Sequence, residues 1–279
     1  MDIKDNEELD YLLPIKIADG IYWVGYSDQN ARLHCNPYII VEDDEAVLID
    51  GGSRDDFSTV MLKILRLGIN PKTINRLIYQ HFDPDLCGNL PHLEAIIENP
   101  DLKIISHRDN NVFINYYSSM TPKLCIEKIG YTYTFKSGRK LEFYRTPYAH
   151  APGSFITYDL KTRTLFSSDI FGSYDANWSL YSNVPEECFK CKPDKYCKID
   201  DKLCPIHGIL DFHRRNMNSK DSLRYALEQI EKLDPILVAP QHGSIINSKK
   251  DLNLIISRLK EEENIGFDYF LQENNHGYR

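Results

Sequence analysis

The chain has 279 residues and carries 33 Lys and Arg against 41 Asp and Glu, which gives a formal net charge of −8. This acidic balance argues against a primary nucleic-acid binder, because affinity for phosphate backbones needs concentrated Lys and Arg. No apolar run approaches the about 18 residues of a membrane span, and no basic-then-apolar signal peptide opens the chain. A hydrophobic content of 42% excludes disorder, so we expect a globular protein of the cytoplasm.

The first half of the chain predicts strands that alternate with helices. Runs rich in β-branched and aromatic residues predict strands, and apolar residues at helical spacing predict helices. The expected strands are 20–26, 37–41, 46–50, 74–80 and 103–107, and the expected helices are 55–67 and 87–98.

The second half repeats this succession. Residues 131–135 and 140–146 predict a hairpin about Ser137 and Gly138. Between 174 and 218 the periodicity disappears, and we expect irregular chain there. The remaining expected elements are strands 154–159, 164–169 and 236–239, a helix capped by Asn218 or Ser219 that shares Leu223, Leu227, Ile230 and Leu233 on one face, and a helix over 250–263.

Strands followed by helices, twice over, fit two packed β-sheets with helices on the outside. We therefore expect an α/β fold in one domain that spans 1–279, with a cysteine-rich insertion at about 185–210.

Acidic and imidazole side chains gather where predicted strands end. An extended backbone would put the three that follow strand 74–80 on one side of the chain, whereas a turn at Pro84 would splay them around a centre. A lone Asp or His at a strand end is usually solvated or caps a helix, but an ordered series favours a metal site. The series is His81, Asp83, Asp85, His150, Asp169 and His242.

This ordered series resembles the metallo-β-lactamase superfamily, whose motifs run His-x-His-x-Asp-His, His, Asp, His. The resemblance covers nearly the whole chain and implies an αββα sandwich. Asp83 stands where the hydrolases of the superfamily carry histidine, and a carboxylate at that position favours iron over zinc. Flavodiiron proteins make this kind of exchange, and the segments PYAHAPGS (147–154), FSSDIFGS (166–173) and APQHG (239–243) are similar to theirs.

The resemblance implies a non-haem diiron centre that binds O2 or NO. His81, Asp83 and His150 would hold one iron, Asp85 and His242 would hold the other, and Asp169 would bridge them. At Leu86 the family has a histidine, so the second iron either keeps an open position or is weakened. His34 is one alternative substitute for that ligand.

We also expect no fused flavodoxin domain with FMN, because the chain ends soon after His242. This makes the smaller oxygen-binding diiron proteins of anaerobic bacteria the most similar branch. The resemblance then implies sensing, through a signalling protein, or oxygen or nitric oxide reduction with an external redox partner of rubredoxin or flavodoxin type. It also implies a homodimer.

Four cysteines predict a second metal site within the irregular stretch. Their spacing, Cys-x2-Cys-x5-Cys-x6-Cys, suits Zn²⁺, a single iron or an iron–sulfur cluster. Reduced thiols without metal are the alternative, and His207 is a rival ligand for Cys197. The four residues are Cys188, Cys191, Cys197 and Cys204.

Two other functions fit parts of this pattern. A zinc-dependent metallohydrolase would use metal-bound hydroxide against an ester or thioester, but Asp83 argues against it. A non-catalytic metal-binding scaffold would follow if Leu86 disables the second iron position. Asp50 we expect to order the neighbouring loops and not to bind metal.

Overall fold

The computed structural model describes residues 9–26, 33–118, 120–174, 178–197 and 204–275. In this part of the chain, the first sheet has seven strands in the order of the sequence. Its first four strands are antiparallel, and β4 to β7 are parallel, so the carboxyl ends of β4, β5 and β6 meet at one edge. The strands are β1 (Ile15–Ala18), β2 (Ile21–Trp23), β3 (Tyr38–Glu42), β4 (Glu45–Ile49), β5 (Ile74–Ile78), β6 (Lys103–Ser106) and β7 (Lys123–Cys125).

The second sheet has the order β12-β11-β10-β9-β8 in the described residues. Only β11 and β12 pair in parallel, and the predicted hairpin is present as β8 and β9. The strands are β8 (Thr132–Thr134), β9 (Lys140–Arg145), β10 (Phe155–Asp159), β11 (Thr164–Phe166) and β12 (Leu237–Ala239).

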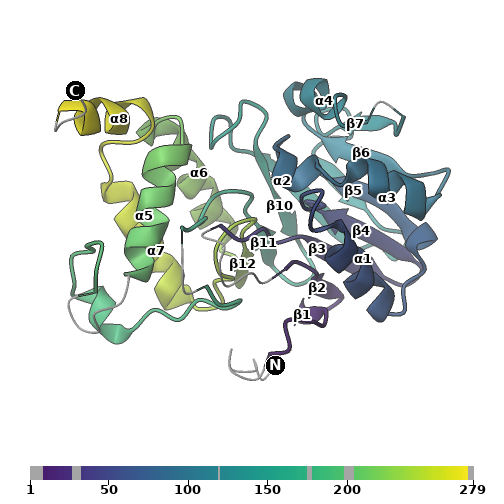
Figure 1. The fold of residues 1–279 in the computed structure, drawn as a ribbon, viewed down its shortest axis with the longest axis horizontal. Helices are drawn as coiled ribbons and strands as arrows, with labels where there is room; N and C mark the ends of the chain where they lie inside the picture. Colours follow the sequence, from purple (N-terminus) through teal and green to yellow (C-terminus); the bar gives the residue numbers. More distant parts are fainter. Residues whose placement is uncertain (1–8, 27–32, 119, 175–177, 198–203, 276–279) are drawn as a thin grey trace.

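Helices lie on the outer side of each sheet (Figure 1). Those beside the first sheet are α1 (Phe57–Arg66), α2 (Pro84–Cys87), α3 (Leu90–Ile97) and α4 (Arg108–Ile114). Those beside the second sheet are α5 (Pro205–Asn216), α6 (Lys220–Leu233) and α7 (Lys249–Glu261), and α8 (Phe267–Asn275) contacts α5. Among the described helices, none is long and apolar enough to cross a membrane.

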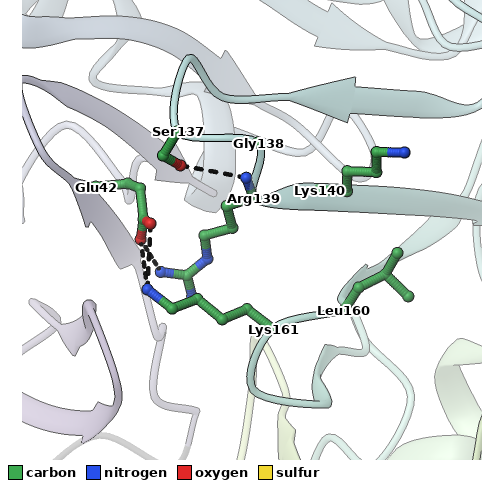
Figure 2. A pocket seen from close by; sticks show the side chains of 7 residues that line it. All are labelled: Glu42, Ser137, Gly138, Arg139, Lys140, Leu160 and Lys161. Carbon is green, nitrogen blue, oxygen red and sulfur yellow. Dashed lines mark hydrogen bonds and ion pairs between the residues drawn. The ribbon is translucent and has the colours of Figure 1, made fainter.

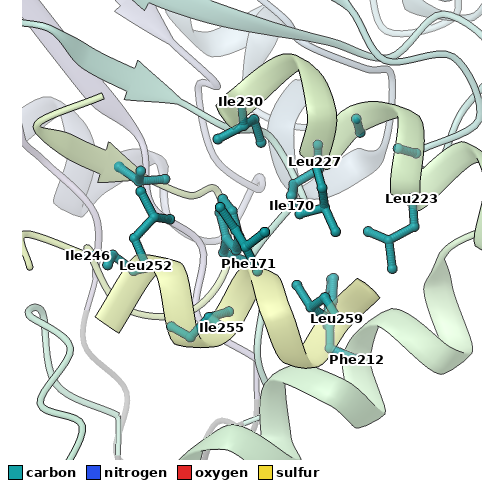
Figure 3. Packing of buried hydrophobic residues seen from close by; sticks show 14 of the residues in the cluster. Ile170, Phe171, Phe212, Leu223, Leu227, Ile230, Ile246, Leu252, Ile255 and Leu259 are labelled. Carbon is teal, nitrogen blue, oxygen red and sulfur yellow. The ribbon is translucent and has the colours of Figure 1, made fainter. Parts of the chain in front are cut away.

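Among the described residues, three apolar clusters hold these layers together. One lies between the sheets and includes Trp23, Phe155 and Phe166, and another joins the first sheet to α1 and α3. The third lies under α6 and α7, where Leu227 and Leu259 pack toward Phe171 (Figure 3). The expected α/β sandwich of two packed sheets is therefore confirmed.

An ion-pair cluster ties the sheets together where Glu42 ends β3 and Arg139 precedes β9 (Figure 2). Arg139, just before β9, donates to both carboxylate oxygens of Asp159 at 2.9 and 2.8 Å and to Glu42 of β3 at 2.8 Å. Lys161 adds a contact of 3.1 Å to Glu42. The side chains of Arg139 and Asp159 are fully buried, so each charge is stabilised by the other and not by water.

Part of the expected element series was wrong. Residues 205–216, expected to be irregular, form α5, because Pro205 opens the helix and Ile206, Leu210 and Phe212 are buried against the second sheet. The strands expected over 74–80 and 164–169 end at Ile78 and Phe166. The one-domain organisation stays a prediction, and residues 198–203 of the cysteine-rich insertion lie outside the described residues.

Candidate metal centre

The loop after β5 turns where Pro84 begins α2. Asp83 is the extended residue before the helix, and its Oδ2 lies 3.8 Å from Nε2 of His81. Asp83 faces His150, with 3.2 Å between its Oδ2 and the imidazole Nε2, whereas Asp85 faces His242. Of the two backbone alternatives for this loop, the structure has the turn that splays the three side chains.

The first group of ligand atoms comprises His81, His150 and Asp169, whose nitrogens and oxygen lie within 4.8 Å of one another. The carboxylate of Asp169 is 3.1 Å from His150 Nε2 and 3.6 Å from His81 Nε2. His81 comes from the first sheet, and the other two come from loops of the second. The two sheets therefore meet at these side chains.

The second group comprises Cys35, Asp85 and His242. His242 Nε2 lies 3.0 Å from Asp85 Oδ2 and 4.0 Å from Asp169 Oδ1. Asp169 therefore lies between the two groups: its Oδ2 faces His150, and its Oδ1 lies 3.6 Å from His81 Nε2 and 4.0 Å from His242 Nε2.

Hydrogen bonds behind the imidazoles fix which nitrogen faces the centre. His242 Nδ1 lies 2.9 Å from the carbonyl of His34, so it donates there and Nε2 is the nitrogen that faces Asp85. His81 Nδ1 lies 3.0 Å from Ser168 Oγ, and Gln241 Nε2 donates to Asp85 Oδ2 at 3.1 Å. Such outer contacts orient the ligands of a metal in advance.

The backbone beside the ligands is strained. Tyr148, Ser168 and Phe171 have φ values of 61°, 53° and 72°, a left-handed conformation that costs energy for residues other than glycine. Ser168 is adjacent to Asp169, Phe171 lies two positions after it, and Tyr148 lies two positions before His150. Strain of this kind collects at functional sites, where the surrounding structure holds it in place.

The pKa values of the two histidines of the first group shift in opposite directions. Burial lowers the pKa of His81, which favours the neutral ring. At His150 burial also opposes the charge, but the carboxylates of Asp169 and Asp83 outweigh it and raise the pKa to about 9. A cation between these groups would take the place of the proton on His150.

Three buried atoms of the centre have no hydrogen-bond partner among the described residues: His81 Nε2, His150 Nε2 and Asp169 Oδ1. Buried polar atoms are nearly always satisfied. All three face the space between the ligands, and imidazole with carboxylate is a donor set that iron and zinc both accept. The residues present therefore fit a metal ion.

Two residues near the centre have roles other than ligation. Asp50 is buried, and its carboxylate accepts hydrogen bonds from the backbone N–H and the side-chain amide of Gln80, so its expected ordering role is confirmed. His34 stacks on Trp178, with 4.4 Å between the rings, and its carbonyl orients His242. Cys35, which the sequence reasoning did not select, has its sulfur at the second group instead.

The four clustered cysteines come from two sides of the irregular segment. Cys188 lies in a short 3-10 helix (Glu186–Phe189), and Cys204 is the residue before α5; both are buried. Burial and the thiols of Cys204, Cys197 and Cys191 together raise the pKa of Cys188 to about 11. The compact groups of ligand atoms among the described residues are the two given above, and neither includes these cysteines. His207 has Asp211 and Arg214 as its charged neighbours. All seven cysteines of the chain are free thiols.

Two packed sheets, helices outside and a His/Asp centre where loops of both sheets meet define a metal-binding sandwich of the metallo-β-lactamase type. A family model described as ODP family beta lactamase matches residues 33–243. The chain belongs to this family, and the expected flavodiiron-like branch of the superfamily is confirmed.

Solved structures share this fold. One, described as the peroxy diiron species of chemotaxis sensor ODP, has a TM-score of 0.71 at 23% identity and covers 91% of this chain and 94% of its own. Rubredoxin oxygen:oxidoreductase from Desulfovibrio gigas has a TM-score of 0.75 at 22% identity, over 89% of this chain and 61% of that one.

Curated relatives are longer proteins. The nitric oxide reductase of Moorella thermoacetica is 28% identical over 247 residues, which are 83% of this chain and 57% of the relative. The chain spans about half the length of the curated relatives it matches.

Proposed function

We propose that this chain is a non-haem diiron protein that binds O2 or NO. In this proposal His81, Asp83 and His150 hold one iron, and Asp85 and His242 hold the other. Asp169 bridges them. The observation that carries the proposal is the position of Asp169 between the two groups, with Oδ2 at 3.1 Å from His150 Nε2 and Oδ1 within 4.0 Å of Nε2 of both His81 and His242.

Two ferrous ions in these positions would supply electrons to a bound O2 or NO. The residues of the chain would orient the centre and keep water away from it. The ring of Phe212 lies 5.6 Å from that of His242, and His213 accepts a hydrogen bond from the backbone N–H of Phe171, so α5 covers this side.

The donor set supports iron over zinc. Asp83 gives the first group a second carboxylate where the zinc hydrolases of the superfamily use histidine, and hard anionic oxygen suits iron better than imidazole does. The relatives named as a nitric oxide reductase and as a diiron chemotaxis sensor support the same choice. The zinc-dependent hydrolase is therefore the weaker proposal.

Whether the bound gas is reduced or sensed depends on the protein with which this chain interacts. Reduction would draw electrons from a separate protein of rubredoxin or flavodoxin type, whereas sensing would pass a change at the centre to a signalling protein or across a homodimer. The free thiols support a reducing compartment such as the cytoplasm.

We also propose that Cys188, Cys191, Cys197 and Cys204 hold a second, tetrahedral metal site. Their spacing in the sequence and the effect of the other three thiols on the pKa of Cys188 support four thiolate ligands, with His207 as the alternative to Cys197. A zinc ion or a single iron bound there would link the 3-10 helix that carries Cys188 to the start of α5.

Metal analysis of protein purified without oxygen tests the main proposal, with absorption spectra before and after air. We expect at least two irons per chain and a spectral change with O2. Asp169→Ala should lose iron from both positions, because the bridge is removed, whereas Asp101→Ala, at an exposed position, should keep it. Zinc alone, no response to air, or two irons retained in Asp169→Ala would contradict the proposal.

A further inference from the structure

The second metal position is short of a ligand. Only Asp85 and His242 were expected there besides the bridging Asp169, because Leu86 replaces a histidine of the family. Leu86 is fully buried in the apolar cluster between the first sheet and its helices, and its side chain has no atom that binds a metal. An iron with so few protein ligands would be weakly held.

Cys35 brings a sulfur to this position. Its Sγ lies 3.8 Å from Asp85 Oδ2, the oxygen that also lies 3.0 Å from His242 Nε2. Ligand atoms at about 2.0 to 2.3 Å from one ion lie roughly 3 to 4 Å apart, so both separations from Asp85 suit a shared ion. The sulfur also lies 4.0 Å from Nδ1 of His242, and the three ligand atoms lie within 4.8 Å of one another. Asp169 Oδ1, buried and without a hydrogen-bond partner among the described residues, faces the same place.

The surrounding chain fixes the position of Cys35 through its neighbour Asn36. The Asn36 amide donates to the carbonyls of Pro240 and Gly243 at 3.1 and 2.8 Å, and its backbone N–H donates to Gln241 at 2.8 Å. The segment that carries Cys35 is thus bound to the loop that carries His242. A side chain at Gly25 would collide with the carbonyl of Cys35, at 2.8 Å, so a glycine there permits this approach.

We propose that Cys35 is a protein ligand of the second metal ion, together with Asp85, His242 and the bridging Asp169. This inference rests on the proposed metal centre and deepens it. The thiol would lose its proton on binding, because coordinating thiols are deprotonated. A thiolate adds one negative charge and a soft, polarisable donor to a centre otherwise made of imidazole and carboxylate.

Anaerobic titration with Co²⁺ tests this ligand. The titration is done on a Cys191→Ser/Cys197→Ser background, so that the clustered cysteines do not contribute thiolate absorption. We expect a near-ultraviolet thiolate-to-cobalt band in this background and its loss in the additional variant Cys35→Ala. The affinity for one of two cobalt equivalents should fall at least about tenfold, the lower limit seen for changes even in outer contacts.

Cys125→Ala on the same background is the matched control, because Cys125 is a buried free thiol whose sulfur contacts Glu127, away from the centre. Cys35→Ser replaces only the sulfur by oxygen, so it serves as a second variant if Cys35→Ala fails to fold. It should also lose the band. Two bound cobalt ions without a thiolate band, or a band unchanged in Cys35→Ala, would overturn this ligand and leave the diiron proposal standing. A background protein that binds no cobalt at either group would overturn both.

Discussion

Lys63 is a buried lysine of α1 that lies against the residues at the end of β2. Its Nζ donates to the carbonyl of Gly25 at 2.6 Å and lies 3.8 Å from the centre of the Trp23 ring. Gly25 in turn packs against the backbone of Cys35. One lysine therefore supports both the β2 end and the neighbouring loop.

Burial lowers the pKa of Lys63 to about 7 from an ordinary value of 10.5. Between these two values the unfolded chain binds more protons than the folded one, so the free energy of unfolding should rise with pH. We expect this rise from pH 7 to 10 in the wild type and its loss in Lys63→Met. Denaturant unfolding of both proteins across this range measures it.

The exposed Lys72→Met is the control, and it should keep the pH dependence of the wild type. Parallel curves for the wild type and Lys63→Met would show that Lys63 stays charged in the folded protein, against the expectation.

At the scale of the elements, α6 shows how a predicted signal becomes structure. Ser219 accepts a hydrogen bond from the backbone N–H of Ser222, and Ser222 returns one to the Ser219 N–H. The helix then buries Leu223, Leu227 and Ile230, as its apolar spacing predicted.

Ser219→Ala should lower the free energy of unfolding by about 1 kcal/mol, because the first turn loses its cap. Ser257→Ala, at an exposed position inside α7, is the control and should have little effect. Chemical denaturation of the three proteins compares them, and equal midpoints for Ser219→Ala and the wild type would contradict the role of the cap.

The elements that the sequence did not predict have physical reasons in common. Tyr79 and Ser167 are fully buried although they lie past the ends of β5 and β11, so the metal-binding loops resemble strand in composition. In α5 Gly208 and the polar His207 interrupt the apolar pattern, and the preceding cysteines indicated a loop. The apolar pattern therefore could not distinguish a buried loop residue from a strand residue, and it could not reveal a helix whose apolar positions are interrupted.

The candidate site was predictable to the extent that its residues follow one another in a familiar order. The structure brings His81, Asp83, His150 and Asp169 together at one place, and Asp85 with His242 at the next. Cys35 carries no such signal, since it lies 50 positions before Asp85 and meets it only because the loop before β3 crosses the His242 loop.

At the scale of the whole molecule, Arg139 links the two sheets at the amino end of β4, opposite the edge where the metal-binding loop follows β5. Its ion pair with Glu42 is drawn in Figure 2. Its bidentate contact with Asp159 belongs to the second sheet, and its contact with Glu42 reaches the first. A buried charge without its partner is strongly destabilising.

Arg139→Met should therefore lower the free energy of unfolding by about 3 to 5 kcal/mol, because Asp159 is left buried and unpaired. Lys140→Met, next in sequence and exposed, is the matched control. Thermal and denaturant unfolding measure the change, and a loss no larger than that of the control would contradict this account of the cluster.

The two tryptophans of the chain give the second metal position an intrinsic optical reporter. The Trp23 indole donates to Asn36, beside Cys35, and the Trp178 indole donates to Gly243, beside His242. Their rings lie 5.8 Å apart, and that of His34 is stacked on Trp178. Since the chain has only these two tryptophans, its fluorescence emission arises where the Cys35 and His242 loops meet, and occupancy of that half of the centre can be followed without any label.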